Sequence, residues 1–196
     1  MKPTHRRILI FVVALVVVAG GYLTYRLVAT SQRNVPQQFS EARSQGAIIS
    51  ERIVASSNEI AASIARLSSP TSTQLQVSST ISEIAVKVSE VRAKDLELAG
   101  TLDAMARAVI DIRSSEAQQA ALKAISQRLE LVGRLESYTD QVTRLVVAMR
   151  LRLDNGIRNN SDIAKLVQEI NAEVAAVNEA SRLADELMAE FDSLLR

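Results

Sequence analysis

From Phe39 almost to the C-terminus, apolar residues recur at alternating intervals of three and four residues, and this seven-residue repeat strongly limits the possible folds. It is most regular between Val77 and Ile112, where every step keeps the spacing. An α-helix turns once in about 3.6 residues, so the repeat places these side chains on one stripe of a helix. Such a stripe is buried by packing against another helix. The sequence therefore predicts an all-α fold with coiled-coil-like heptad seams.

Breaks in the repeat divide the chain into four predicted helices, at about 37–67, 73–113, 116–154 and 162–195. Residues 68–73 are polar and contain Pro70, which cannot continue a helix, and Asn155-Gly156 is typical of a helix C-terminus. Beyond Arg113 the preceding register falls on polar residues. The chain either turns there or continues as one rod with a stutter. The capping pair Ser115 and Gln118 favours the turn.

The predicted seams follow from this spacing. In the first and second helices they are Phe39, Ala42, Gly46, Ile49, Ile53, Ser56, Ile60, Ser63 and Leu67, and Val77, Ile81, Ile84, Val88, Val91, Asp95, Leu98, Leu102, Met105, Val109 and Ile112. In the third and fourth they are Leu122, Ile125, Leu129, Val132, Leu135, Tyr138, Val142, Leu145 and Met149, and Ile163, Leu166, Ile170, Val174, Val177, Ala180, Ala184, Leu187, Phe191 and Leu194. Val146, Val147 and Ala148, beside the third seam, widen its apolar face, so we expect this helix to be the most buried.

Four long helices with short connections are typical of an antiparallel up-down bundle. The alternative is an open coiled-coil hairpin that completes its core by forming oligomers. Asp95 is the one acid on the seam of the second predicted helix. It is a candidate polar core position that fixes the helix register, and Arg92 and Lys94 are its expected local partners.

The N-terminal segment predicts a membrane anchor before the bundle. Residues 8–25 carry no charge, and at about 1.5 Å per residue this run spans about 27 Å, close to the hydrocarbon thickness of a bilayer. Because the Arg26 side chain can reach the interface, we expect a transmembrane helix over 8–29, with Tyr22 and Tyr25 at the membrane surface. A neck at 30–36, interrupted by Pro36, connects it to the bundle.

The orientation of the anchor follows from Lys2, Arg6 and Arg7, which make residues 1–7 a short basic tail. The positive-inside rule places this tail in the cytoplasm and residues 37–196 outside it, periplasmic or at the cell surface of a bacterium. The segment then acts as a signal anchor of a single-pass protein in the cell membrane. The alternative is a cleavable signal peptide cut after Ala19.

The charge balance and the residue types exclude several classes of function. Residues 1–34 hold five basic residues and no acid, which leaves 18 basic against 22 acidic residues in the rest, so no nucleic-acid partner is expected. Because the chain has no cysteine, it forms neither disulfides nor thiolate metal sites. No motif for a catalytic, cofactor or metal site was found. We expect a non-enzymatic protein without cofactors and without a small-molecule substrate.

A short basic tail, one anchor and about 160 residues of antiparallel helix resemble the layout of bacterial LemA-type proteins. The segment QQFSEARSQGAIISERIV after the anchor does not carry the characteristic residues of that family, so the resemblance assigns no residue role. The first hypothesis is an envelope scaffold that binds the lipid bilayer through its anchor and protein partners, or itself, through helix faces. The alternative is a ligand-sensing bundle that signals through a partner membrane protein.

Overall fold

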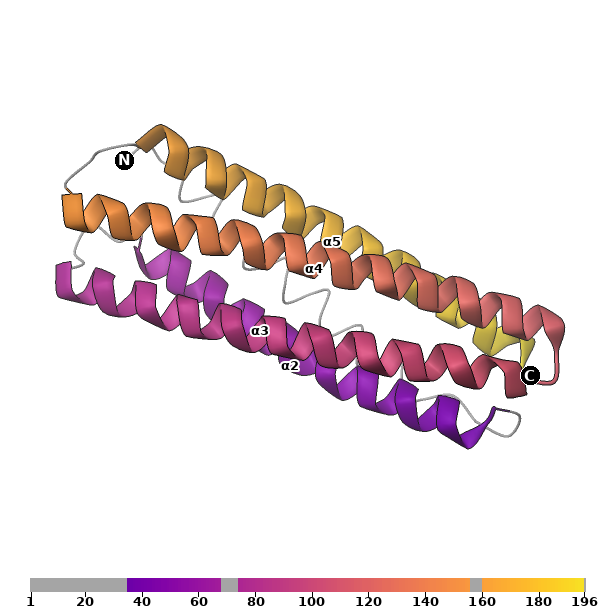
Figure 1. Cartoon of the computed structure of the whole chain (residues 1–196). Coiled ribbons are helices and arrows are strands. Elements are labelled where there is room, and N and C mark those ends of the chain that lie inside the picture. The colour runs from indigo at the N-terminus through magenta and orange to yellow at the C-terminus, as the bar shows by residue number, and fades with distance from the viewer. Residues whose placement is uncertain (1–34, 68–73, 156–159, 196) are drawn as a thin grey trace.

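The computed structural model describes residues 35–67, 74–155 and 160–195, and this part of the chain is almost entirely helical (Figure 1). Its elements are α2 (Gln37–Leu67), α3 (Gln74–Ala108), a 3-10 turn η1 (Val109–Asp111), α4 (Ser115–Asn155) and α5 (Asn160–Leu194). The prediction of an all-α fold with four packed helices is confirmed. The second helix ends earlier than predicted, because its last turn tightens into η1.

The chain reverses direction between α3 and α4, so the rod alternative is not seen. Ile112 is extended, with φ of −76° and ψ of 128°, which ends the helix. Ser114, not Ser115, caps α4, since its hydroxyl accepts a hydrogen bond from the Ala117 amide at 3.3 Å. The Gln118 side-chain amide donates to the carbonyl oxygens of Ile110 and Ile112 at 3.2 and 2.8 Å. These contacts provide hydrogen-bond partners for backbone groups that have none within the helix at its ends.

Consecutive helices run antiparallel, so η1, the start of α2 and the end of α5 lie at the same end of the bundle (Figure 1). We call this end the η1 end and the opposite one the far end. Helix backbones approach closely where α2 meets α3, where α3 meets α4 and where α4 meets α5. In the described part of the chain, α2 and α5 do not approach each other this closely. The bundle therefore consists of two helical hairpins joined tightly along α3 and α4.

Among the described residues, no helix is long and apolar enough to cross a membrane. The predicted tail 1–7 and membrane helix 8–29 lie outside the described residues, and so do neck residues 30–34. The same holds for the residues expected to set anchor and topology, which are Lys2, Arg6, Arg7, Tyr22, Tyr25 and Arg26.

The α3 seam is confirmed along its length, since every position from Ile81 to Ile112 is buried and Val77 is partly buried. The seam of α4 was predicted correctly at Ile125 and from Leu135 to Leu145, which are buried, but wrongly at two other positions. Leu122 and Leu129 are each 48% exposed. Of the residues expected to widen the buried face, Val146 is buried, Ala148 is partly buried and Val147 is half-exposed. The buried positions on the continuous seam are Ala117, Ala121, Ala124, Arg128, Leu131, Leu135, Tyr138, Val142 and Leu145.

The register error in α4 has a simple cause. The predicted seam stepped by three residues at Leu129, Val132 and Leu135 in succession, in order to collect the large apolar side chains. The observed seam keeps the strict three-four alternation, which holds one face of the helix toward its neighbours. Alanines at the start of α4 allow the neighbouring helices to come close, and the strict spacing brings Arg128 into the core.

Smaller shifts occur in α2 and α5. In α2, Ser50 and Ser57 are buried, whereas the predicted Ile49 and Ser56 are partly exposed. Gly46 lies where α2 contacts α3: a Cβ atom there would be 3.2 Å from Thr101 Oγ1 and 3.6 Å from Leu98 Cδ1. In α5, Met188 is buried, while Leu194, predicted on the seam, is largely exposed.

Candidate functional site: buried charges in the helix bundle

Two buried arginines and two partly buried aspartates form two ion pairs toward the η1 end, which we together call the arginine–aspartate cluster (Arg43, Arg128, Asp185 and Asp192). Arg43 on α2 donates two parallel hydrogen bonds to the Asp192 carboxylate on α5, at 2.7 and 2.9 Å. The two side chains are 6% and 12% exposed. Such two-pronged geometry is the strongest form of arginine–carboxylate pair, and it connects the first described helix to the last.

The second pair of the cluster joins α4 to α5. Arg128 Nη2 lies 3.5 Å from Asp185 Oδ1, and these side chains are 6% and 11% exposed. Burial lowers the pKa of Arg128, an effect that Asp185 and Asp192 oppose and that Arg43 strengthens. Arg43 and Asp192 therefore influence the charge of Arg128 as well as each other.

The cluster is incompletely hydrogen-bonded. Arg43 Nε, Arg128 Nε and Arg128 Nη2 are buried and have no hydrogen-bond partner. A buried polar atom without a partner costs about 1–3 kcal/mol relative to one that is satisfied. The cluster is therefore less stabilising than its short Arg43–Asp192 distances suggest.

An aromatic pair lies beside the cluster and also joins α2 to α5. The ring centroids of Phe39 and Phe191 are 5.3 Å apart, with the planes tilted by 45°. Both side chains are fully buried. Phe191 directly precedes Asp192, and Phe39 lies one turn before Arg43, so the aromatic and ionic contacts together close the wide α2–α5 side at the η1 end.

The sequence pattern did not predict that these charges are buried. Arg43 and Arg128 occupy seam positions, four residues after Phe39 and three before Leu131. The signal was present, because extending the strict spacing back from Leu135 passes through Leu131 to Arg128. It was missed because apolar side chains were used to define the seam.

Asp95 lies on the α3 seam, buried at 6% exposure, and its Oδ1 atom has no hydrogen-bond partner. Burial raises the pKa of Asp95 to about 7, and the charge of Glu136 on α4 adds to the rise. The expected local partners bind elsewhere. Lys94 Nζ is 2.6 Å from Glu97, and Arg92 pairs with Asp140 while its Nε donates to Thr139 Oγ1 at 3.3 Å. Asp95 thus lies in the core without a basic partner.

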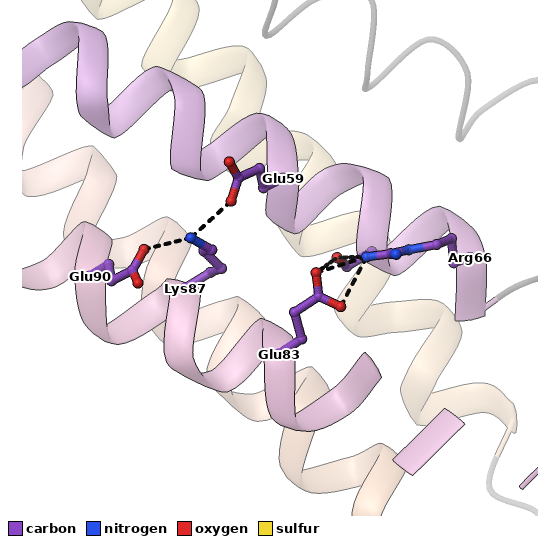
Figure 2. Close-up of polar contacts among 6 residues, drawn as sticks. Glu59, Arg66, Glu83, Lys87 and Glu90 are labelled. Carbon is purple, nitrogen blue, oxygen red and sulfur yellow. Dashed lines mark hydrogen bonds and ion pairs between the residues drawn. The ribbon is translucent and has the colours of Figure 1, made fainter. Parts of the chain in front are cut away.

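A group of ion pairs at the surface, which we call the ion-pair ladder, connects α2 and α3 toward the far end (Figure 2). Arg66 Nη2 donates to both carboxylate oxygens of Glu83, at 2.9 and 3.0 Å. Lys87 Nζ lies 2.9 Å from Glu59 and 2.9 Å from Glu90. These acids raise the pKa of Lys87. Ion pairs at the surface contribute little to stability, so we assign the ladder a structural role.

Among residues 35–67, 74–155 and 160–195, no group of three or more acidic or histidine side chains is placed to hold a metal ion. The arginine–aspartate cluster contains two arginines and two aspartates, so its formal charges balance. Comparisons with protein families, with curated proteins and with solved structures found no match for this chain. The likeness to LemA-type proteins therefore remains one of layout.

Proposed function

We propose that this chain is a single-pass membrane protein whose extracytoplasmic four-helix bundle binds an apolar helix face of a partner protein or of a second copy. In this proposal, residues 8–29 form the anchor and residues 1–7 lie in the cytoplasm. The bundle acts as a scaffolding or interaction module and has no enzymatic activity. The observation that carries the interaction is the outer face of α4.

Four large apolar side chains lie exposed along α4, and we call them the apolar stripe (Leu122, Leu129, Val147 and Leu151). Each is about half exposed. In the seven-residue repeat that α4 keeps toward its neighbours, Leu122 and Leu129 share one position, and Val147 and Leu151 lie one turn apart further along the helix. Large apolar residues aligned on a solvent-facing side of a helix are typical of a surface that packs against another helix.

The anchor is supported by the N-terminal sequence. The uncharged run matches the thickness of a bilayer, Tyr22, Tyr25 and Arg26 suit its outer surface, and Lys2, Arg6 and Arg7 favour a cytoplasmic N-terminus. Residues 30–36 would then keep the η1 end of the bundle near the membrane. A seven-residue segment reaches at most about 25 Å.

Site-specific photo-cross-linking tests the interaction. A photoreactive amino acid would replace Leu122 or Leu129 in the full-length protein, in membranes of the cells from which the protein comes. Control variants carry it at Lys123 or Glu130, one residue further on and rotated by about 100°. We expect a discrete adduct from the leucine positions, whose mass shows whether it is a dimer or a second protein. Equal labelling at all four positions, or none, would contradict the proposal.

Cysteine labelling tests the topology independently, because the natural chain has no cysteine. We expect Ser126→Cys to react with a membrane-impermeant maleimide in intact cells. Thr4→Cys should react with the same maleimide only after the membrane has been permeabilised. If the intact mass of the mature protein corresponds to a chain that begins at Gly20, the N-terminal segment is instead a cleaved signal peptide.

A ligand-sensing bundle is the second candidate, and buried unpaired polar atoms favour it. Asp95 Oδ1, Gln141 Oε1 and Asn178 Nδ2 are buried without hydrogen-bond partners. A small polar solute could satisfy such atoms. If a free amino acid raises the melting temperature of the natural protein but not that of Asp95→Leu, this function is favoured over the scaffold.

A further inference from the structure

The side of the bundle between α2 and α5 differs from the other three sides. The backbones of the other neighbouring helices come close together, but in the described residues α2 and α5 remain further apart. Long side chains bridge the distance at the η1 end, through the Phe39–Phe191 contact and the Arg43–Asp192 pair. The attachment of α2 to α5 therefore depends on a few side chains.

The buried face of α2 is also poor in apolar surface. Its buried residues are Phe39, Ala42, Arg43, Gly46, Ala47, Ser50, Ile53, Ser57, Ile60, Ala61 and Ser63. Of these, Phe39, Ile53 and Ile60 are large and apolar. Because the free energy of burial scales with apolar area, α2 gains less from packing than α3, whose buried residues are mostly isoleucine, leucine and valine.

The ion pair that joins α2 to α5 is itself finely balanced. Taking an arginine and a carboxylate out of water costs several kcal/mol for each ion, and their attraction only partly or just offsets this cost. Removing one partner leaves a buried charge, which is strongly unfavourable. A helix segment with little apolar burial, joined to one of its two neighbours mainly by such a pair, is suited to local opening.

We propose that residues 37–50 of α2 form a releasable strap, which the Arg43–Asp192 pair holds against α5 and which opens while α3, α4 and α5 stay packed together. Opening exposes Phe191 and the part of the α3 seam around Leu98 and Leu102, a second apolar surface besides the stripe on α4. This inference concerns the described bundle and does not depend on the proposed anchor.

Hydrogen exchange measured by mass spectrometry on the full-length protein tests the strap. Asp192→Asn keeps the shape of the side chain and removes its charge. We expect peptides from residues 37–50 to exchange at least tenfold faster, while those from 131–146 and 170–181 keep their rates. Asp103→Asn is the matched control, since Asp103 forms an exposed ion pair with Arg107, and it should leave all rates unchanged. Unchanged rates in 37–50, or equal acceleration in every helix, would overturn the proposal.

A second variant tests the same proposal in the opposite direction. Arg43→Leu combined with Asp192→Leu replaces the ion pair with apolar side chains, which commonly equals or exceeds a buried pair in stability. We expect exchange in residues 37–50 to be as slow as in the natural protein or slower. If residues 37–50 exchange faster in the double variant than in Asp192→Asn, the ion pair does not control the release of the strap and the proposal is refuted.

Spin labels provide a direct distance measurement. Ser44→Cys on α2 and Glu190→Cys on α5 are exposed positions at the η1 end. We expect one short distance in the natural background and an added longer one with Asp192→Asn. Labels at Ala104 and Ser126 on α3 and α4 should show a single distance in both backgrounds. A single unchanged distance between α2 and α5 in Asp192→Asn would contradict the release of the strap.

Discussion

At the scale of single residues, the polar side chains on seam positions decide the character of this bundle. Asp95 could be predicted to lie on the seam, because the repeat around it is unbroken. Its lack of a basic partner could not be predicted, since it depends on Arg92 turning toward Asp140 on α4. Arg43 and Arg128 show the same limit. Their burial depends on acids of α5 that lie far away in the sequence.

The free energy of unfolding should depend on pH through Asp95. Its folded pKa of about 7 lies above the value of about 3.9 in an unfolded chain, so between these values the folded state binds more protons. The contribution of Asp95 to stability therefore falls as the pH rises through this window. We expect Asp95→Asn to be more stable than the natural protein by about 1 to 3 kcal/mol near pH 8 and equal to it near pH 4. Denaturant titrations at both pH values check this, and a difference independent of pH would contradict the assignment.

The glycines should respond differently to the same substitution. Gly100 and Gly133 have no heavy atom within 4 Å of an added Cβ, whereas Gly46 has Thr101 Oγ1 at 3.2 Å. Alanine favours a helix over glycine by about 1 kcal/mol. We expect Gly100→Ala and Gly133→Ala to raise the free energy of unfolding by about 0.5–1 kcal/mol, and Gly46→Ala to gain less or lose stability. Equal gains at all three positions would show that α2 and α3 do not meet closely at Gly46.

At the scale of helices, the sequence allowed α3 to be predicted almost completely and α4 only in part. The α3 seam carries large apolar residues at nearly every step, so a strict spacing and a search for apolar residues give the same answer. In α4 they diverge. Choosing large apolar side chains selects Leu122 and Leu129, whereas the strict spacing selects Ala121, Ala124 and Arg128. Steric space between helices and the charges of α5 decide the register, and neither is visible in α4 itself.

Two leucines in α4 discriminate between the predicted and the observed register. Leu131 is 7% exposed and Leu129 is 48% exposed. Truncating a buried leucine costs about 2–5 kcal/mol, whereas surface substitutions usually change stability by about 0.5 kcal/mol. We therefore expect Leu131→Ala to destabilise the protein strongly and Leu129→Ala to have little effect, measured by denaturant unfolding. The reverse order would support the seam predicted from the sequence.

At the scale of the whole molecule, short connections were enough to predict that consecutive helices lie antiparallel and pack together. They did not predict that the bundle closes unevenly. The distance between α2 and α5 depends on which side chains meet across it, and those residues come from opposite ends of the described chain. The seven-residue repeat predicts the seam of each helix separately. How closely the four seams pack against one another depends on the assembled bundle.

The Phe39–Phe191 contact allows this closure to be measured as a coupling between the first and the last helix. Aromatic pairs at this separation contribute about 0.5–1.5 kcal/mol beyond the area that they bury. In a cycle of Phe39→Leu, Phe191→Leu and the double variant, we expect the free energies of unfolding to depart from additivity by about that amount. Phe39→Leu combined with Val142→Ala, which lies on α4 toward the middle of the bundle, should be additive within about 0.5 kcal/mol. Additivity in both cycles would mean that α2 and α5 are held together by other contacts and that the η1 end is not closed by this aromatic pair.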